Sequence, residues 1–165
     1  SIGFDTGTSQ TFAVGDTLTD KSATLQYMVE GKADRNKPST LGIDYKAFTV
    51  PLPGSKVPTK VMWWDTGGKQ LFRTIMTSYF KAAQCVVVFY SVSSAKTLDG
   101  AIDLVHEFWS TCREGVAPII LVGACAHPDC VRAVTTQEGV AAARKLQQAR
   151  QQEYEKISFP FCARP

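Results

Sequence analysis

Short apolar runs alternate with amphipathic stretches along this chain, and the alternation predicts an α/β fold in which helices flank a mostly parallel sheet. Residues 11–14 form the first apolar run, and residues 21–30 have the pattern of a helix that follows it. Residues 43–52 and 59–64 are extended segments, separated by a proline- and glycine-containing turn at 53–56. The front of the chain therefore predicts a strand, a helix and then an antiparallel hairpin.

Two further apolar runs, at 85–90 and 119–122, are continuous, as strands buried on both faces of a sheet require. We therefore expect both to be central strands. Between them, apolar residues recur at intervals of three and four and predict one buried face of a helix. These residues are Leu98, Ile102, Val105 and Trp109.

The last third of the chain contains a helix start signal. Thr135 and Glu138 have the spacing of a capping box, which predicts a helix from there to about residue 155. Residues 157–161 are apolar and predict a final strand. With this strand the expected sheet has six strands.

Length and composition fit a single domain. The chain has 165 residues, of which 44% are hydrophobic, and we expect one domain over 1–165 with residues 1–9 as an N-terminal extension. The formal charge is +3 and the basic residues are spread along the chain, so we expect no nucleic-acid partner. The longest apolar run is far shorter than the roughly 20 residues that span a bilayer.

Cysteine usage favours a cytoplasmic location. Five cysteines occur without any C-x-x-C pair, which is typical of reduced thiols. Four potential soft ligands lie within 19 residues, so a metal site is an alternative, although their spacings match no common zinc module. They are Cys112, Cys125, His127 and Cys130.

The segment 15–22 lies between the first strand and the first helix and keeps Gly15, Lys21 and Ser22 of the Walker A pattern G-x-x-x-x-G-K-[ST]. In that pattern, backbone N–H groups at a helix N-terminus hold phosphates, the lysine reaches the outer phosphates and the hydroxyl binds Mg²⁺. For this loop taken alone, an unrelated turn with a chance Lys-Ser pair is the alternative.

Asp20 stands at the second glycine of the pattern and opposes phosphate binding. At ~5 Å and an effective dielectric constant of ~20, a carboxylate repels each unit of phosphate charge by roughly 3 kcal/mol. We expect Asp20 to cap the first helix with its own carboxylate, with Lys21 beside it as a counter-ion.

Further motifs follow in the order and spacing of Rab proteins in the Ras superfamily. Residues 39–46, Ser-Thr-Leu-Gly-Ile-Asp-Tyr-Lys, resemble switch I and the strand after it, and residues 64–68, Trp-Asp-Thr-Gly-Gly, resemble the W-D-T-A-G of switch II. Residues 71–83 and 88–92 also resemble Rab sequence. The chain thus resembles a Rab-like small GTPase over about 11–163, which implies a Ras-like P-loop GTPase fold.

The resemblance implies a site for GTP or GDP with Mg²⁺. Its implied metal ligands are Ser22, Thr40 and Asp65. Its implied nucleotide-binding residues are Gly15, Asp16, Thr17, Asp20, Lys21, Ser22, Thr40, Gly68 and Ala163.

Other positions depart from the family pattern. Lys69 replaces the glutamine that orients the attacking water, and an ammonium cannot accept a hydrogen bond from water. Lys69 is then either a solvated residue or a partner for γ-phosphate charge. Residues 124–127, Ala-Cys-Ala-His, replace the N-K-x-D that recognises guanine, so base discrimination should be lost. These departures predict a pseudo-GTPase, with weak or absent GTP binding and hydrolysis.

The favoured role is a protein-binding module that uses its switch and interswitch surface. In Rab proteins an aromatic cluster on this surface contacts effectors. The candidates in this chain are Phe48, Trp64 and Tyr79. The alternative is that these three are core residues, which would have no such role. The alternatives are a slow GTP-hydrolysing switch in vesicle or intraflagellar trafficking, at an endomembrane surface or cilium, and a subunit of a larger assembly.

The C-terminal end carries two expectations of its own. In the family the segment around Ala163 precedes a last helix, so we expect that helix to be missing from this chain. Cys162 lies fourth from the end, but Arg164 and Pro165 are poor prenylation residues, so truncation is favoured over a direct membrane anchor.

Overall fold

The computed structural model describes residues 8–32, 40–51, 54, 57–68, 81–111, 117–125 and 130–157. Within them the chain forms five strands and three helices. In chain order these are β1 (Thr8–Gly15), α1 (Lys21–Glu30), β2 (Ile43–Val50), β3 (Thr59–Thr66), β4 (Cys85–Ser91), α3 (Ala95–Thr111), β5 (Ile119–Ala124) and α4 (Thr136–Ile157).

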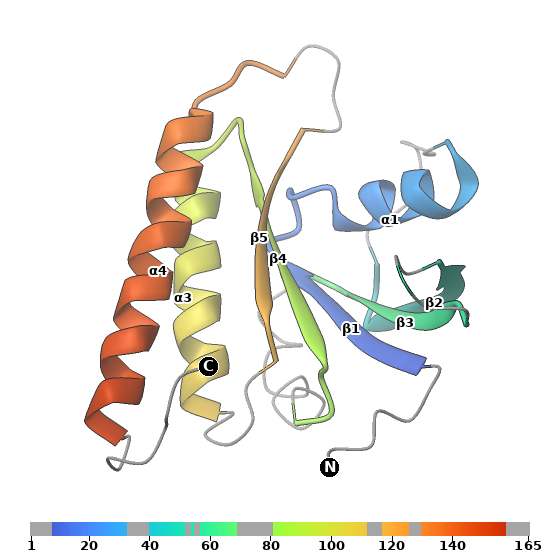
Figure 1. Ribbon diagram of the computed structural model, residues 1–165. Helices are drawn as coiled ribbons and strands as arrows, with labels where there is room; N and C mark the ends of the chain where they lie inside the picture. Colours follow the sequence, from blue (N-terminus) through green and yellow to red (C-terminus); the bar gives the residue numbers. More distant parts are fainter. Residues whose placement is uncertain are drawn as a thin grey trace.

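The strands form one sheet in the order β2-β3-β1-β4-β5. β1 pairs in parallel with β3 and β4, β4 pairs in parallel with β5, and β2 joins β3 as an antiparallel hairpin. Figure 1 shows α1 on one face of the sheet and α3 and α4 on the other. The predicted α/β class and mostly parallel sheet are confirmed. Because the parallel strands end at one edge, the loops that follow β1, β3, β4 and β5 meet there.

β1 begins three residues earlier than the first apolar run. Thr8, Ser9 and Gln10 pair with residues 60–62 of β3, so the sheet includes two residues that we assigned to an N-terminal extension. The apolar pattern did not predict this part of the strand, because its side chains are polar and its pairing with β3 uses the backbone.

The two strands that we expected to be central, β4 and β5, differ in burial and in their position in the sheet. Residues 86–90 of β4 are buried, as predicted. β5 is the edge strand among the described residues, and Ile120 is 50% exposed, so its prediction as a strand buried on both faces is wrong for this part of the chain. Ile157, expected to begin a sixth strand, is the last residue of α4, because helix-forming residues continue to that point; residues 158–161 lie outside the described residues.

The larger core cluster lies between the sheet and helices α3 and α4. Val105 of α3 is fully buried, as predicted, and its neighbours in the core are Ala101, Leu104 and Phe108. The other predicted residues of this face, Leu98, Ile102 and Trp109, are only partly buried at the margin of the cluster. The helix face turned toward the sheet is therefore rotated from the predicted one.

The smaller core cluster lies on the α1 face of the sheet. Leu25 of α1 packs there with Ala13, Val87 and Phe89. Trp63 of β3 meets the edge of the Phe89 ring, with the ring centroids 6.5 Å apart. This packing places the start of α1 beside the end of β1. Residues 15–22, the Walker-like loop, lie at this junction.

Candidate functional site

The loop between β1 and α1 begins at a position where a glycine is required. Gly15 has a φ of +149°, and a β-carbon there would lie 2.5 Å from the Phe89 carbonyl oxygen and 2.9 Å from Thr19 Oγ1. The Thr19 side chain is fully buried and donates its hydroxyl to the carbonyl of Asp16 at 2.7 Å. The loop is thus held in a compact turn by its own groups.

Lys21 is buried beneath this turn. Its ammonium donates to the carbonyl oxygens of Gly15 at 2.9 Å and Asp16 at 2.7 Å, and lies 3.4 Å from Thr19 Oγ1. Burial lowers the pKa of Lys21, and the nearby charges of Asp65, Asp16 and Asp20, in that order of size, act in the opposite direction. An ammonium has three N–H donors, and the loop offers an acceptor to each.

Asp20 occupies the N-cap position of α1, but its side chain makes no capping hydrogen bond, so the predicted carboxylate cap is wrong. The reason is its backbone conformation, with φ 53° and ψ 26°, because an N-cap side chain reaches the helix N–H groups from the β region. Asp20 is also not the main counter-ion of Lys21, since Asp65 affects the pKa of Lys21 more. Among residues other than glycine, aspartate is one of the few that adopt this left-handed conformation.

Ser22, Thr40 and Asp65 come together at the start of α1. The Ser22 and Thr40 hydroxyl oxygens are 2.9 Å apart, and both side chains hydrogen-bond to Asp65 Oδ2, Thr40 at 3.2 Å. Asp65 Oδ1 is buried and has no hydrogen-bond partner. Burial raises the pKa of the Asp65 carboxyl, against the opposing effects of Ser22, Lys21 and Thr40.

These oxygens fit a magnesium ion. Mg²⁺ prefers hard oxygen ligands and retains several waters, and an unpartnered carboxylate oxygen beside two hydroxyls offers that donor set. Ser22, Thr40 and Asp65 would hold the ion, which supplies positive charge for phosphate oxygens when bound.

Gly68 lies directly against the Walker-like loop. A β-carbon on Gly68 would lie 2.7 Å from the Thr17 α-carbon and closer still to the Thr17 amide nitrogen. The Asp16 carboxylate accepts hydrogen bonds from the Thr17 amide and hydroxyl. Gly67 N donates to Gly42 O at 2.8 Å, which ties the end of β3 to the start of β2.

The end of β5, where we expect the family motif for guanine to be replaced, carries small and sulfur-containing side chains. Ala124 is buried, and Cys125 is exposed and in hydrogen-bonding contact with Cys130. No group of three or more histidine, cysteine or acidic residues that could hold a metal occurs in the part of the chain that the structure describes. Several predicted residues lie outside the described residues, namely Lys69, Tyr79, Cys112, His127 and Ala163.

The predicted aromatic cluster is divided between the two faces of the sheet. Phe48 packs against Trp63 on the α1 face, with ring centroids 6.4 Å apart, whereas Trp64 stacks on Phe12 at 5.9 Å on the opposite face. Successive residues of a strand alternate between faces, so Phe48 and Trp64 cannot form one surface, and their grouping is wrong.

Tyr45 is the aromatic neighbour that our sequence analysis missed. It lies opposite Trp64 in the β2–β3 pairing, the two rings are 5.3 Å apart, and Tyr45 is 55% exposed. Trp64 is half-buried and donates its indole N–H to Gln10 Oε1 at 2.6 Å. The hairpin register would have identified the pair, because it places these residues side by side.

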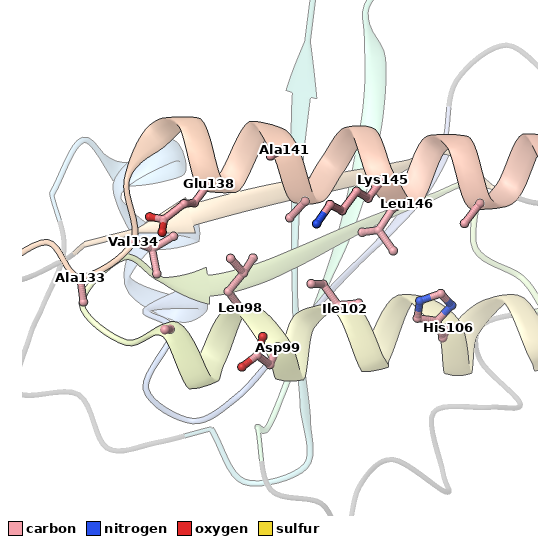
Figure 2. A pocket seen from close by; sticks show the side chains of 13 residues that line it. Leu98, Asp99, Ile102, His106, Ala133, Val134, Glu138, Ala141, Lys145 and Leu146 are labelled. Atoms are coloured by element: carbon pink, nitrogen blue, oxygen red, sulfur yellow. The ribbon is translucent and has the colours of Figure 1, made fainter.

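A separate groove of about 570 Å³ lies between α3 and α4. Figure 2 shows Leu98 and Ile102 of α3 facing Leu146 of α4 across it. The groove is on the face of the sheet opposite α1, so it does not belong to the Walker-like site. None of the helices in the described ranges is long and apolar enough to cross a membrane.

Three features define an α/β domain of the P-loop GTPase type. They are the element order, the mostly parallel sheet and the loop that begins at Gly15 between β1 and α1. The family model of the Ras family matches residues 10–156, so the chain belongs to the Ras family. The Rab-like character predicted from the motifs is confirmed by its relatives.

Three curated relatives illustrate the similarity. The Ras-related protein SEC4 of Saccharomyces cerevisiae is 34% identical over 136 residues, which cover 81% of this chain and 60% of that protein. The Ras-related protein RABC2a of Arabidopsis thaliana is 31% identical, with coverages of 81% and 62%, and the Ras-related protein Rab-10 of Caenorhabditis elegans is 31% identical, with coverages of 76% and 60%. The chain therefore spans about 60% of the length of these relatives.

Proposed function

We propose that this chain is a Rab-like pseudo-GTPase that binds a protein partner and binds guanine nucleotide weakly or not at all. The observation that carries the proposal is the state of Lys21, whose ammonium is buried and donates to Gly15 and Asp16 carbonyl oxygens of its own loop. A loop satisfied in this way gains less from a phosphate than one with an unpaired cation, because binding exchanges existing hydrogen bonds for new ones.

Asp20 and Gly68 add to this argument. The Asp20 carboxylate lies at the N-terminus of α1, where a phosphate would otherwise gain from the helix dipole, and it repels that phosphate by roughly 3 kcal/mol per unit charge at ~5 Å. Gly68 lies against the backbone of Asp16 and Thr17, so the segment after β3 occupies space directly beside the loop. Loss of the guanine motif at 124–127 would remove the remaining source of specificity.

Partner binding is proposed for the surface formed by Tyr45 and Trp64. Rab proteins act through protein effectors, and an exposed tyrosine packed on a half-buried tryptophan offers the aromatic contact that is enriched at protein interfaces. An endomembrane surface or a cilium is the location that such a role implies by analogy with the family, and a subunit of a larger assembly could use the same surface.

A second function, a slow GTP-hydrolysing switch, is favoured by one observation. Ser22, Thr40 and Asp65 retain a set of oxygens that fits Mg²⁺, with Asp65 Oδ1 unpartnered. In a switch, the metal and the γ-phosphate order the loops, and hydrolysis releases them.

Thermal unfolding with GTP and Mg²⁺ separates the two functions. The pseudo-GTPase predicts no change in melting temperature at millimolar GTP–Mg²⁺, whereas a ligand at 100 times its dissociation constant would stabilise the fold by about 2.7 kcal/mol. ATP–Mg²⁺ is the matched control for non-specific phosphate effects. A rise in melting temperature with GTP–Mg²⁺ but not with ATP–Mg²⁺, together with release of phosphate over hours, would support the switch and overturn the pseudo-GTPase.

A further inference from the structure

Two cysteine thiols meet beside the end of β5. Cys125 directly follows the strand and is exposed, whereas Cys130 is half-buried and packs against the larger core cluster. Neither is in a disulfide, and their side chains are in hydrogen-bonding contact. The two thiols are thus direct neighbours.

The backbone around the two cysteines explains why they meet. Val92, which is buried, donates its N–H to the Ala124 carbonyl at 3.0 Å, immediately before Cys125. The Val92 carbonyl accepts the N–H groups of Ala133 at 2.8 Å and Val134 at 2.9 Å, shortly after Cys130. One buried residue therefore anchors both cysteine-bearing segments.

We propose that Cys125 and Cys130 form a redox-active dithiol, which a low-molecular-weight disulfide such as glutathione disulfide oxidises to an intramolecular disulfide. The Cys125 thiolate attacks one sulfur of glutathione disulfide, forms a mixed disulfide and releases one glutathione thiolate. The Cys130 thiol then loses its proton to solvent and its sulfur attacks Cys125, which releases the second glutathione. Two protein thiols are oxidised and one glutathione disulfide is reduced.

The environments of the two thiols assign their order of reaction. Cys125 is exposed and is reached first from solvent. Contact with Cys125 and burial raise the pKa of the Cys130 thiol, so Cys130 stays protonated and serves as the resolving thiol. Ser93, which follows Val92, also hydrogen-bonds to Cys130 and helps to hold it beside Cys125.

A bound metal is the alternative that the test must separate from a disulfide, because cysteine thiolates also bind zinc. Among the described residues, no group of three or more histidine, cysteine or acidic side chains could hold a metal. The disulfide would join the end of β5 to the segment that leads into α4. It depends on neither nucleotide binding nor the proposed partner surface.

The test uses the whole chain equilibrated in glutathione buffers of graded oxidised-to-reduced ratio, followed by alkylation and peptide mapping without reduction. Oxidation should remove two thiols per chain and give one cross-linked peptide pair that contains Cys125 and Cys130. Cys130→Ser should stop at a glutathione adduct on Cys125, and Cys125→Ser should leave Cys130 unmodified. Cys85→Ser, at the half-buried first residue of β4, is the matched control and should behave as the wild type.

Three results would overturn the proposal. They are full alkylation of both cysteines at every ratio, a disulfide to another cysteine, and a bound metal that protects the pair until a chelator is added. The mapping of the wild-type chain alone decides among them, so the test holds even where a serine variant fails to fold.

Discussion

Gly68 and Thr17 lie so close that only a hydrogen fits on the inner side of the Gly68 α-carbon. The atoms that a larger side chain would meet belong to the backbone of the Walker-like loop, which cannot swing aside as a flexible side chain can. This contact ties the segment after β3 to the loop after β1.

Gly68→Ala should therefore destabilise the fold by about 1–3 kcal/mol, measured by urea unfolding. The matched control is Gly100→Ala in α3, where a β-carbon meets nothing within 4 Å and a helix interior favours alanine by about 0.5–1 kcal/mol. Equal effects of the two substitutions would contradict the packing that we describe.

Asp20 should limit nucleotide affinity by charge rather than by backbone geometry, because its backbone already has the left-handed conformation that glycine adopts freely. Asp20→Asn removes the charge and keeps the tolerance for that conformation, so it should raise the affinity for fluorescent GDP at least tenfold, and Asp20→Gly should do the same. Asp99→Asn, at an exposed carboxylate of α3 on the other face of the sheet, is the control and should leave the affinity unchanged. If only the glycine variant gains affinity, the electrostatic explanation is wrong.

Tyr45 should contribute to partner binding with little effect on folding. Tyr45→Ala removes a side chain that is 55% exposed, so the melting temperature should change by only a few degrees, while a bound partner should be lost from affinity-purified complexes. Tyr27→Ala, at a 64% exposed tyrosine of α1, is the matched control and should retain the partner. Equal recovery with both variants would exclude the proposed surface.

The capping box of α4 should make stability depend on pH at the acid side. The Thr135 amide and hydroxyl donate to Glu138 at 2.7 and 2.8 Å, and these bonds lower the pKa of Glu138 below its ordinary value of 4.5. Because the folded pKa is lower than the unfolded one, this contribution is present above about pH 4.5 and is lost as the pH falls through the folded pKa.

Glu138→Gln keeps the acceptor but does not titrate, so its melting temperature should fall less than that of the wild type between about pH 5 and 3. Circular dichroism at the two ends of this range measures the difference. Parallel pH curves for the wild type and the variant would contradict a role for the ionised carboxylate.

Local signals in the sequence were sufficient for much of the fold. The bounds of α1, the antiparallel hairpin and the capping box at Thr135 were predicted because each depends on neighbouring residues. The exposure of Ile120 and the extension of α4 to Ile157 were not, because they depend on which elements lie beside them. The burial of a strand depends on which elements pack beside it, and the periodicity of its residues does not identify those elements.

At the candidate site, too, some features were predicted from the sequence and others were not. The motifs at Ser22, Thr40 and Asp65 brought together residues from three segments, since the family pattern carries long-range information. The grouping of Phe48 with Trp64 failed because it ignored the alternation of faces along β2, and the predicted cap at Asp20 failed because sequence did not reveal its left-handed backbone. Register and backbone conformation were the missing facts.

The most direct test of the pseudo-GTPase proposal is the nucleotide content of the native protein. The chain is purified without added nucleotide, denatured, and the released small molecules are separated by chromatography and compared with the protein concentration. We predict far less than one guanine nucleotide per chain, because Lys21 is satisfied within its loop and Asp20 opposes phosphate. One GDP or GTP per chain would contradict the proposal.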